Sequence, residues 1–503
     1  MILLALSVEK ISSVLSSWVW SWALVALCLC SGLYFSLRTR FVQVRRFGAM
    51  ARLLFNTDKT QKTGISSFQA FAMALSGRVG TGNIVGVATA IGYGGPGAIV
   101  WMWIIAFLGA GSAFVEATLA QIYKENHNGQ FRGGPSYYIE KGLRCKWMAV
   151  LFAICSIIAC GLLLPQVQSN GMAIAFSNSL NIKPFYIGLA VAVVLGLVII
   201  GGVKRIAKVA EIVAPFMAVI YVILAIVVLI INHTAIPSVL VDMIKGAIGT
   251  HELFGGIIGS TIAWGVKRGI YSNEAGQGTG PIVASAAKVS HPVKQGLVQA
   301  FSVYVDTLLV CSATAVMIMA VKTYNVMDAN TGEVLFTSAY NLGAPDVSYT
   351  STALGTLLGM NWGNIVVAVA LAFFAFTTIM AYYYYAETSI VYLFGKGKKE
   401  HTVVWLLRIF ILVAVVFGSL KEARTAWNAG DIGVGMMAWI NIIAILLLSP
   451  KALRTLKDYE KQEKEGKDPV FDPEKLNIPN ADFWTARKAA SESQPQSQNP
   501  QSQ

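Results

Sequence analysis

The chain has 503 residues, of which 55% are hydrophobic and only 13% are charged, and its mean hydropathy is +0.59. This composition excludes an ordinary soluble globular protein and indicates a polytopic membrane protein. The net charge of +13 does not indicate nucleic-acid binding, because the basic residues lie in short connections between apolar segments, where they encode orientation in a membrane.

Apolar segments long enough to cross a bilayer define the predicted elements. A hydrocarbon core of about 30 Å takes about 20 helical residues. We therefore predict an all-α polytopic membrane protein with about 11 transmembrane helices. In chain order their limits are 16–37, 67–92, 97–122, 147–178, 185–201, 207–232, 253–286, 294–321, 362–394, 402–419 and 432–449. Residues 1–15 lack the basic start of a signal peptide, so the first span is expected to stay.

The connections alternate in charge. The basic ones follow the first, third, fifth, seventh and ninth spans, and they contain Arg38, Arg40, Arg45, Arg46, Arg52, Lys59, Lys62, Lys124, Arg132, Lys141, Arg144, Lys146, Lys204, Arg205, Lys208, Lys288, Lys294, Lys396, Lys398 and Lys399. The positive-inside rule then places the N-terminus outside and the C-terminal tail in the cytosol. The largest outer loop, residues 322–361, is expected to fold over the outer face.

Two predicted spans contain helix breakers. Glycines 77, 80, 82 and 86 interrupt span 67–92, and the stretch 264–281 interrupts the seventh span. Such glycines can serve close helix packing. Two interruptions in corresponding places instead indicate a transporter site, because backbone opened at membrane depth must line a cavity or bind something.

The two interrupted spans lie five apart, and five is odd. Two five-helix units in tandem would therefore cross the membrane in opposite directions, as a 5+5 inverted repeat. The predicted units are 1–66, an extra transmembrane helix with a basic cytosolic loop; 67–232, the first repeat; 233–449, the second repeat; and 450–503, a cytosolic tail. The tail ends in Ser-Gln-Pro repeats at 491–503, too polar to bury a core, and is expected to be partly disordered.

The first interruption can hold both signs of charge. The N–H groups of residues 80–83 would begin a half-helix whose positive end suits a carboxylate. Carbonyls around Ser76 and Val79 suit a hard cation such as Na⁺. Thr377 and Thr378, in the ninth span, either bond back to their own helix or ligate that cation.

Other polar groups at membrane depth are candidates for function. Gln166, Gln168 and Asn170 in the fourth span either link helices or face a substrate. Arg78 and Glu274 could pair across the two interruptions. The further ionisable candidates are Glu116, Glu211, Lys267, Arg268, Asp306 and Glu387, of which Glu116 and Glu211 are expected to meet loop lysines.

Enzyme chemistry and metal binding by cysteine or histidine find no support in the motifs. The sequence contains no HExxH, GxSxG or Walker-type loop, and its six cysteines form neither a CxxC nor a cluster with histidine. The cysteines are expected to be buried thiols. No organic cofactor is predicted.

Three motifs resemble one transporter family. Gly80-Thr-Gly-Asn83, the stretch Gly-Val-Lys-Arg-Gly-Ile-Tyr-Ser-Asn-Glu-Ala-Gly-Gln-Gly-Thr-Gly-Pro at 265–281, and Gly133-Gly-Pro-Ser-Tyr-Tyr138 are similar to those of the alanine or glycine:cation symporter family of bacteria and archaea. The resemblance covers residues 15–450. It implies the leucine-transporter-type (LeuT) fold and import of alanine or glycine with Na⁺, with glutamine favoured by some members.

The resemblance also implies a site. Thr81, Gly82 and Asn83 would meet the substrate carboxylate, Gln168 would line the pocket, and Ser272, Asn273 and Gly276 would hold the amino side. Na⁺ would lie between the carbonyls of Ser76 and Val79 and the hydroxyls of Thr377 and Thr378. Tyr271 and Gln277-Gly-Thr279 depart from the commoner family residues, which leaves the substrate preference open.

The sequence therefore predicts a Na⁺-coupled importer of a small neutral amino acid, working by alternating access in the bacterial plasma membrane. H⁺ coupling through Glu274 or Asp306 and a preference for glutamine remain alternatives. An ion channel would need a continuous polar stripe, which the spans lack. The expected partners are the amino-acid substrate and the lipid bilayer, without an obligatory protein partner.

Overall fold

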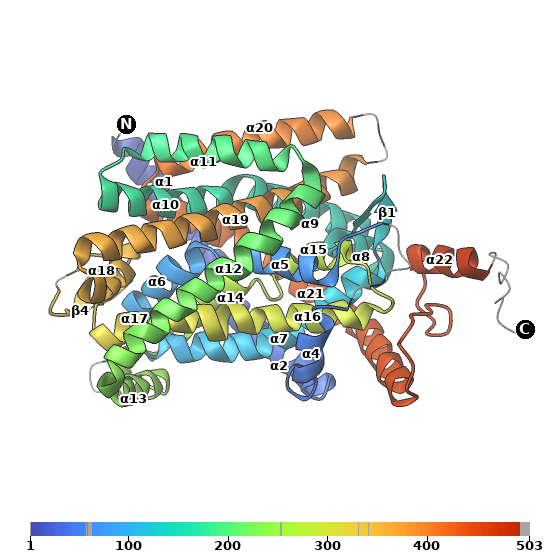
Figure 1. Ribbon diagram of the computed structural model, residues 1–503, viewed down its shortest axis with the longest axis horizontal. Coiled ribbons are helices and arrows are strands. Elements are labelled where there is room, and N and C mark those ends of the chain that lie inside the picture. The colour runs from blue at the N-terminus through green and yellow to red at the C-terminus, as the bar shows by residue number, and fades with distance from the viewer. Residues whose placement is uncertain are drawn as a thin grey trace, which may run out of the picture.

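The computed structural model describes residues 2–492 except 57, 59–62, 252–253, 330, 341, 396 and 398. The chain is built almost entirely of helices, and most long helices run roughly along the longest axis of the molecule (Figure 1). One end carries the N-terminus, α13, α18 and β4, and we call it the cavity end. The opposite end carries β1, α8 and α22, and we call it the tail end.

The helices fall into a first and a second series. The first consists of α1 (Ile2–Val19), α2 (Trp22–Arg38), α3 (Val42–Arg45), α4 (Phe47–Leu53), α5 (Ser67–Arg78), α6 (Val87–Gly94), α7 (Ala98–Ile122), α8 (Pro135–Leu143), α9 (Lys146–Ile158), α10 (Leu164–Leu180), α11 (Pro184–Ile199) and α12 (Gly202–Ile231). The second consists of α13 (Ile236–Ala247), α14 (Ile258–Asn273), α15 (Gly280–Ala286), α16 (Pro292–Val303), α17 (Ser312–Val321), α18 (Val347–Leu358), α19 (Met360–Phe394), α20 (Glu400–Ser419), α21 (Ala423–Lys464) and α22 (Asp482–Glu492).

Short elements complete the description. Three π-helical turns join neighbouring helices: η1 (Gly82–Gly86), η2 (Ala159–Leu163) and η5 (Tyr304–Cys311). Single 3₁₀ turns precede α13 and α14, as η3 (His233–Ala235) and η4 (Gly255–Ile257). Two antiparallel hairpins pair β1 (Glu125–His127) with β2 (Gln130–Arg132) at the tail end, and β3 (Val326–Met327) with β4 (Val334–Phe336) at the cavity end.

The prediction of a polytopic all-α membrane protein is confirmed. In the described part of the chain, 8 helical segments are long and apolar enough to cross a membrane. The other three predicted spans are the shorter apolar helix α11 and the two interrupted segments α5–α6 and α14–α15. Both interruptions are confirmed as helix breaks, and the full count of eleven stays a prediction.

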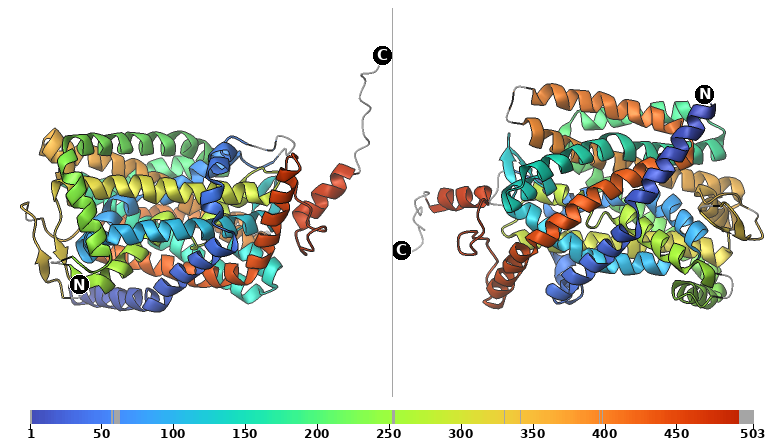
Figure 2. Two further views of the ribbon diagram at one scale, coloured as in Figure 1. Left: turned by 90° about the horizontal axis from the view of Figure 1, so that it is seen from below. Right: turned by 180° about the vertical axis from the view of Figure 1, so that it is seen from behind.

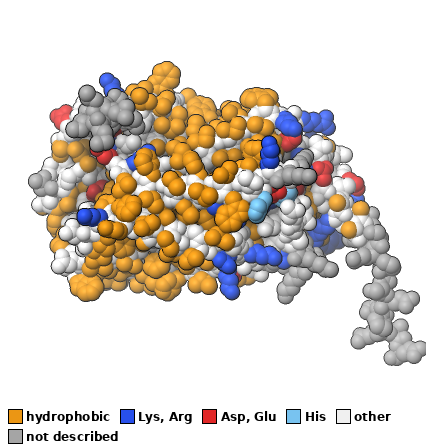
Figure 3. Space-filling view, turned by 90° about the horizontal axis from the view of Figure 1, so that it is seen from above, with side chains coloured by type: hydrophobic (Ala, Val, Ile, Leu, Met, Phe, Trp, Pro, Cys, Tyr) orange, Lys and Arg blue, Asp and Glu red, His pale blue; other side chains and the backbone are white. Residues whose placement is uncertain are grey.

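The outer surface suits a hydrocarbon environment. α12 exposes Ile212, Phe216, Val219 and Ile223 at helical spacing, with Phe216 65% exposed. Hydrophobic side chains cover the middle of one long face, while charged side chains lie mainly toward its two ends (Figure 3). This distribution matches an apolar band between two polar interfaces.

Some glycines serve close helix packing, which was the alternative to a binding site in the sequence analysis. α14 crosses α7 at Gly265, where an added Cβ would lie 2.5 Å from both Ala98 O and Trp101 Cβ. Small residues at such crossings let two helix backbones approach closely. Close packing is needed in a membrane because lipid tails are as apolar as the helices, so the hydrophobic effect does little to drive helices together.

Two predicted boundaries differ from the structure. α21 runs unbroken through Pro450, where the tail was predicted to begin, because proline removes only one N–H and residues 451–464 are rich in Lys, Leu and Glu, which favour helix. The expected first span, 16–37, contains the junction between α1 and α2 at residues 20–21. The repeats predicted at the end of the tail lie outside the described residues from position 493 onward.

We expect Gly265→Ala to destabilise the folded protein by about 1–3 kcal/mol, because the added methyl must displace α7 backbone. Gly259→Ala is the matched control on α14, since its Cβ would meet only Trp22 at an ordinary 3.5 Å. Thermal unfolding of the two detergent-solubilised variants measures the difference. Equal melting temperatures would show that the α7–α14 crossing is not tightly packed.

Candidate functional site

The first break lies between α5 and α6. After α5, Val79 takes an extended conformation with ψ of 94°, and η1 then resumes the helix. Side chains take the place of helical partners here. Gln168 Oε1 accepts the Thr81 N–H at 2.9 Å, and Asn83 Oδ1 accepts the Gly80 N–H at 2.8 Å. Two of the N–H groups predicted for a substrate carboxylate are therefore engaged by the protein in this structure.

A cluster of oxygen atoms lies against this break. Thr378 Oγ1 lies 2.8 Å from Ser76 O, 3.1 Å from Val79 O and 2.9 Å from Phe374 O. A hydroxyl has one proton to donate, so it cannot satisfy three carbonyls at once. A hard cation prefers such a set of oxygens. The structure thus brings together three of the four residues predicted for Na⁺: Ser76, Val79 and Thr378.

Thr377 faces another way. Its hydroxyl lies 3.0 Å from both Phe373 O and Phe374 O, to either of which it can donate, and 3.9 Å from the Met217 sulfur. This is the back-bonding pattern that threonine adopts within a helix. The predicted grouping of Thr377 with the oxygen cluster is therefore absent from the contacts of the described residues.

The second break lies between α14 and α15. Glu274 adopts the left-handed conformation with φ of 57°, and Gly276 follows at φ of 80°. The Gly276 N–H donates to Glu116 Oε1 at 3.2 Å, and its carbonyl accepts from Asn441 Nδ2 at 2.9 Å. Asn441 also donates to Glu116 Oε2 at 2.9 Å, so one carboxylate and one amide satisfy this opened backbone.

Asp306, in η5, joins the two breaks. Its carboxylate accepts from Asn83 Nδ2 at 2.7 Å, from Ser272 Oγ at 2.9 Å and from Thr307 Oγ1 at 2.7 Å. The side chain is fully buried, and among the described residues no Lys, Arg or His lies within ion-pair distance of it. A buried carboxylate held this way is suited to a cation, an ammonium group or a proton.

The sequence marked Asp306 as ionisable at membrane depth but did not place it in the site. The residues predicted for the substrate divide between two places. Asn83 and Ser272 meet at Asp306, Thr81 bonds Gln168, and an added Cβ at Gly82 would lie 3.4 Å from Ser272 Cα. Gly276 belongs with Glu116 and Asn441, and Asn273 Oδ1 caps the Ala275 N–H at 3.0 Å.

Buried polar groups lie on the tail side of the breaks. Arg78 donates to Gln299 O and to Ser302 Oγ, and it forms no ion pair with Glu274 within the described part of the chain. Glu274 instead accepts from Tyr385 OH at 3.3 Å. The predicted Arg78–Glu274 pair is therefore not a direct contact.

The expectation that Glu116 meets a loop lysine is wrong, and Glu211 forms no ion pair with a lysine among the described residues. Glu116 is fully buried on α7, because it satisfies the opened backbone of the second break. Glu211 accepts from Gln69 Nε2 at 3.0 Å, across from α12 to α5. Their positions in the sequence put both carboxylates near predicted helix ends. The sequence does not show which other helix packs against either carboxylate.

A cavity of about 820 Å³ opens on the other side of the breaks, at the cavity end. Lys267, Arg268 and Asp431 line it, together with Trp264 and Trp427. Lys267 Nζ and Arg268 Nη2 contact the same Asp431 oxygen, at 2.6 and 2.7 Å. Lys267 and Arg268 therefore share one carboxylate at this wall of the cavity.

One aromatic layer separates this cavity from the first break. The rings of Tyr271 and Trp427 lie 5.0 Å apart, and an added Cβ at Gly82 would lie 3.2 Å from the Tyr271 ring. Val85 and Thr89, on the helix that follows the break, line the cavity itself. The break therefore lies just beyond the floor of the cavity, and buried polar groups cover it on the side of the tail end.

The described residues contain no group of three or more His, Cys, Asp or Glu side chains placed to hold a metal ion. The oxygen cluster at Thr378 consists instead of carbonyls and a hydroxyl, and such ligands suit an alkali ion.

Comparisons with known proteins find similar sequences that span most of the chain. The model of the sodium:alanine symporter family matches residues 5–473. YrbD of Bacillus subtilis (strain 168), whose name pairs sodium/proton dependence with alanine, is 53% identical over 93% of this chain and 96% of its own. GlnT of the same organism, whose name pairs sodium with glutamine, is 43% identical over 92% of this chain and 93% of its own. The sodium/alanine symporter AgcS of Methanococcus maripaludis is 36% identical over 89% and 96%.

We expect Glu116→Ala to lower the melting temperature strongly, because it leaves the Gly276 N–H and the Asn441 amide without their carboxylate partner. Each buried polar group left unsatisfied costs about 1–3 kcal/mol. Glu116→Gln keeps one carbonyl acceptor and should be milder. Thermal unfolding of both variants provides the measurement, and an unchanged melting temperature for Glu116→Ala would contradict the role assigned to this carboxylate.

Proposed function

The chain belongs to the sodium:alanine symporter family, and from that premise we propose that it imports a small neutral amino acid, alanine or glycine, together with Na⁺ by alternating access. This is a family of carriers and not of enzymes. The observation that supports the proposal most is the pair of helix breaks joined at Asp306, beside an oxygen cluster without a carboxylate.

The substrate would lie between the two breaks. We place its carboxylate toward Thr81, Gly82 and Asn83, with Gln168 lining the pocket, and its amino group toward Ser272, Asn273 and Gly276. The close approach of Tyr271 and Ser272 to Gly82 leaves little space for a side chain, which favours a substrate with a small one. Glutamine, the amino acid in the name of one relative, is the alternative substrate.

Na⁺ would lie among Ser76 O, Val79 O and Thr378 Oγ1. Thr377 would join these ligands only after its side chain changed rotamer. A hydroxyl and carbonyls favour Na⁺ over a proton, since a proton needs a titratable group. Asp306 favours a second candidate, H⁺ coupling, because it is a buried acid that contacts residues of both breaks. The name of one relative mentions sodium and proton together.

Alternating access would use a 5+5 inverted repeat. Two features support it beyond the span order. The first membrane-spanning segment of each proposed repeat is broken, and a short helix follows the second spanning segment of each: α8 after α7, and α18 after α17. α8 lies at the tail end and α18 at the cavity end, as inversion requires (Figure 1). We propose that the cavity end faces outward and the tail end faces the bacterial cytosol.

Counterflow of labelled alanine in proteoliposomes tests this function. We expect uptake that follows an inward Na⁺ gradient and that unlabelled alanine or glycine suppresses. Uptake driven by a pH gradient with no Na⁺ present would favour the Asp306 candidate instead. Glutamine counterflow without alanine counterflow would contradict the proposed substrate.

The two adjacent threonines allow a matched test of the cation site. Thr378→Val removes the hydroxyl that lies against Ser76 and Val79, so it should raise the Na⁺ concentration for half-maximal uptake by about tenfold or more, which corresponds to losing about 1.4 kcal/mol. Thr377→Val removes a hydroxyl bonded to its own helix and should change that concentration much less. Equal effects from both variants would remove Thr378 from its proposed role.

A further inference from the structure

The tail does not simply leave the membrane domain after α21. Arg45 and Arg46 hold the last turns of α21 through Glu460 and Glu463, each at 2.5 Å. The chain then reverses at Gly466, which has φ of 73°. Residues 467–492 return along the tail end of the molecule, where α22 lies beyond α8 and β1 (Figures 1 and 2).

The returning segment first binds the connection between α15 and α16. The Phe471 N–H donates to Ser290 O at 3.1 Å, and Ser290 Oγ donates to Pro469 O at 2.8 Å. Lys294, at the start of α16, pairs with Asp468 at 2.5 Å. This connection follows directly from the second half of the second broken segment.

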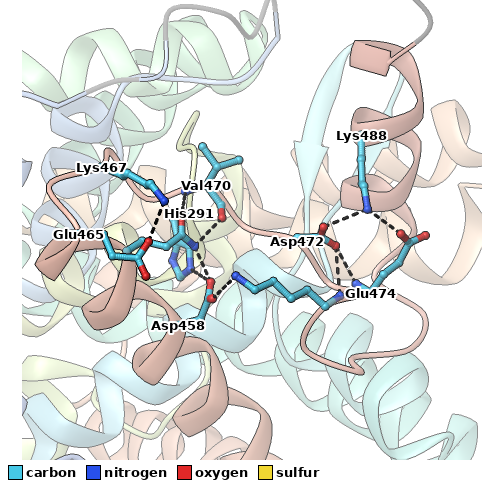
Figure 4. Close-up of polar contacts among 10 residues, drawn as sticks. His291, Asp458, Glu465, Lys467, Val470, Asp472, Glu474 and Lys488 are labelled. Atoms are coloured by element: carbon cyan, nitrogen blue, oxygen red, sulfur yellow. Dashed lines mark hydrogen bonds and ion pairs between the residues drawn. The ribbon is translucent and has the colours of Figure 1, made fainter.

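His291 lies under this contact. Burial lowers the pKa of His291, so the ring is neutral at pH 7, and its Nδ1 accepts the Val293 N–H at 3.3 Å. Its Nε2 lies 3.5 Å from Asp458 of α21, and its ring contacts Phe471 of the tail at 5.6 Å between centroids. Figure 4 shows His291 and Asp458 beside the tail segment that covers them.

α22 then inserts a tryptophan. Trp484 is 2% exposed, and its Nε1 donates to Gln121 O, at the end of α7, at 2.8 Å. The Lys124 ammonium lies 5.1 Å from the Trp484 ring and 4.3 Å from the Phe131 ring, and it donates to Ala287 O at 3.1 Å. The tail thus helps enclose the group that links α7 to the end of α15.

The same helix spans two sides of the tail end. Arg487 pairs with Asp58, on the chain leading into α5, at 2.7 Å. Lys141 of α8 pairs with Asp482 at 2.6 Å. Lys488 folds the segment onto itself through Asp472 and Glu474, at 2.9 and 2.8 Å (Figure 4).

These contacts join segments that, under the alternating access proposed above, separate when the tail end opens. The chain before α5 is already paired with the end of α15: Ile65 N–H donates to Ala286 O at 3.0 Å, and Lys288 N–H donates to Ile65 O at 2.9 Å. These are the tail-side ends of the two broken segments. The tail connects that pair, through Asp58 and Ser290, to α7 and α8 on the other side.

We propose that residues 467–492 form an intramolecular brace that holds the tail end closed, so that release of the brace shifts the protein toward the conformation open at that end. A contact made in one conformation and broken in the other shifts their populations by its differential free energy. The brace is therefore a conformational control that lies outside the substrate and cation sites. It does not depend on which amino acid or ion is carried.

Thiol labelling measures opening directly. Ser285, on α15, is fully buried in this tail-end-closed structure, and Ser285→Cys provides a reporter. Purified protein in nanodiscs is treated with a polar maleimide, and the same protein without Ser285→Cys gives the background from its natural cysteines. We expect Trp484→Ala to raise the Ser285→Cys labelling rate by at least about threefold, and truncation after Gly466 to raise it further.

Val470→Ala is the matched control, since it shortens a side chain in the same tail that is 56% exposed. It should label at the wild-type rate. A wild-type rate in both Trp484→Ala and the truncated protein would overturn the proposal, and so would an equal increase in Val470→Ala. If Trp484→Ala does not give a monodisperse protein, Asp482→Asn, which loses the pair with Lys141, replaces it under the same criteria.

Discussion

The structure depends on one constraint: peptide groups opened inside a bilayer must find partners, because no water is there to bind them. Two helices are opened, and buried polar side chains satisfy them. Gln168 and Asn83 take N–H groups of the first break, while Glu116 and Asn441 hold both sides of Gly276 in the second. The same groups surround the site that we propose for the substrate.

The two ends of the molecule cover this region to different extents. The cavity end leaves an 820 Å³ cavity that stops at an aromatic layer over the first break. The tail end covers the breaks with buried polar groups, then with the paired ends of α5 and α15, and finally with the returning tail. A carrier needs one barrier that opens while the other closes. In the proposed cycle, the thin aromatic layer at the cavity end and the thicker cover at the tail end would be these two barriers.

The sequence predicted the features that are local in the chain. Long apolar stretches predicted the spans, and clustered glycines predicted both breaks. Both signals can be read within a short window of the sequence. It could not decide between Thr377 and Thr378, since neighbouring side chains on a helix point about 100° apart and only tertiary packing selects one. The contact of Asp306 with both breaks, the role of Glu116 and the folded tail were missed for the same reason, as their partners lie on distant segments.

We propose that substrate and cation share the first break, with the cation at Ser76, Val79 and Thr378 and the substrate at the residues that follow. Calorimetric titration of the purified protein tests it most directly. Linkage requires that Na⁺ raise the affinity for alanine by the same factor by which alanine raises the affinity for Na⁺. We expect this shared factor to be large in the wild-type protein. An alanine affinity that does not change with Na⁺ concentration would contradict the account.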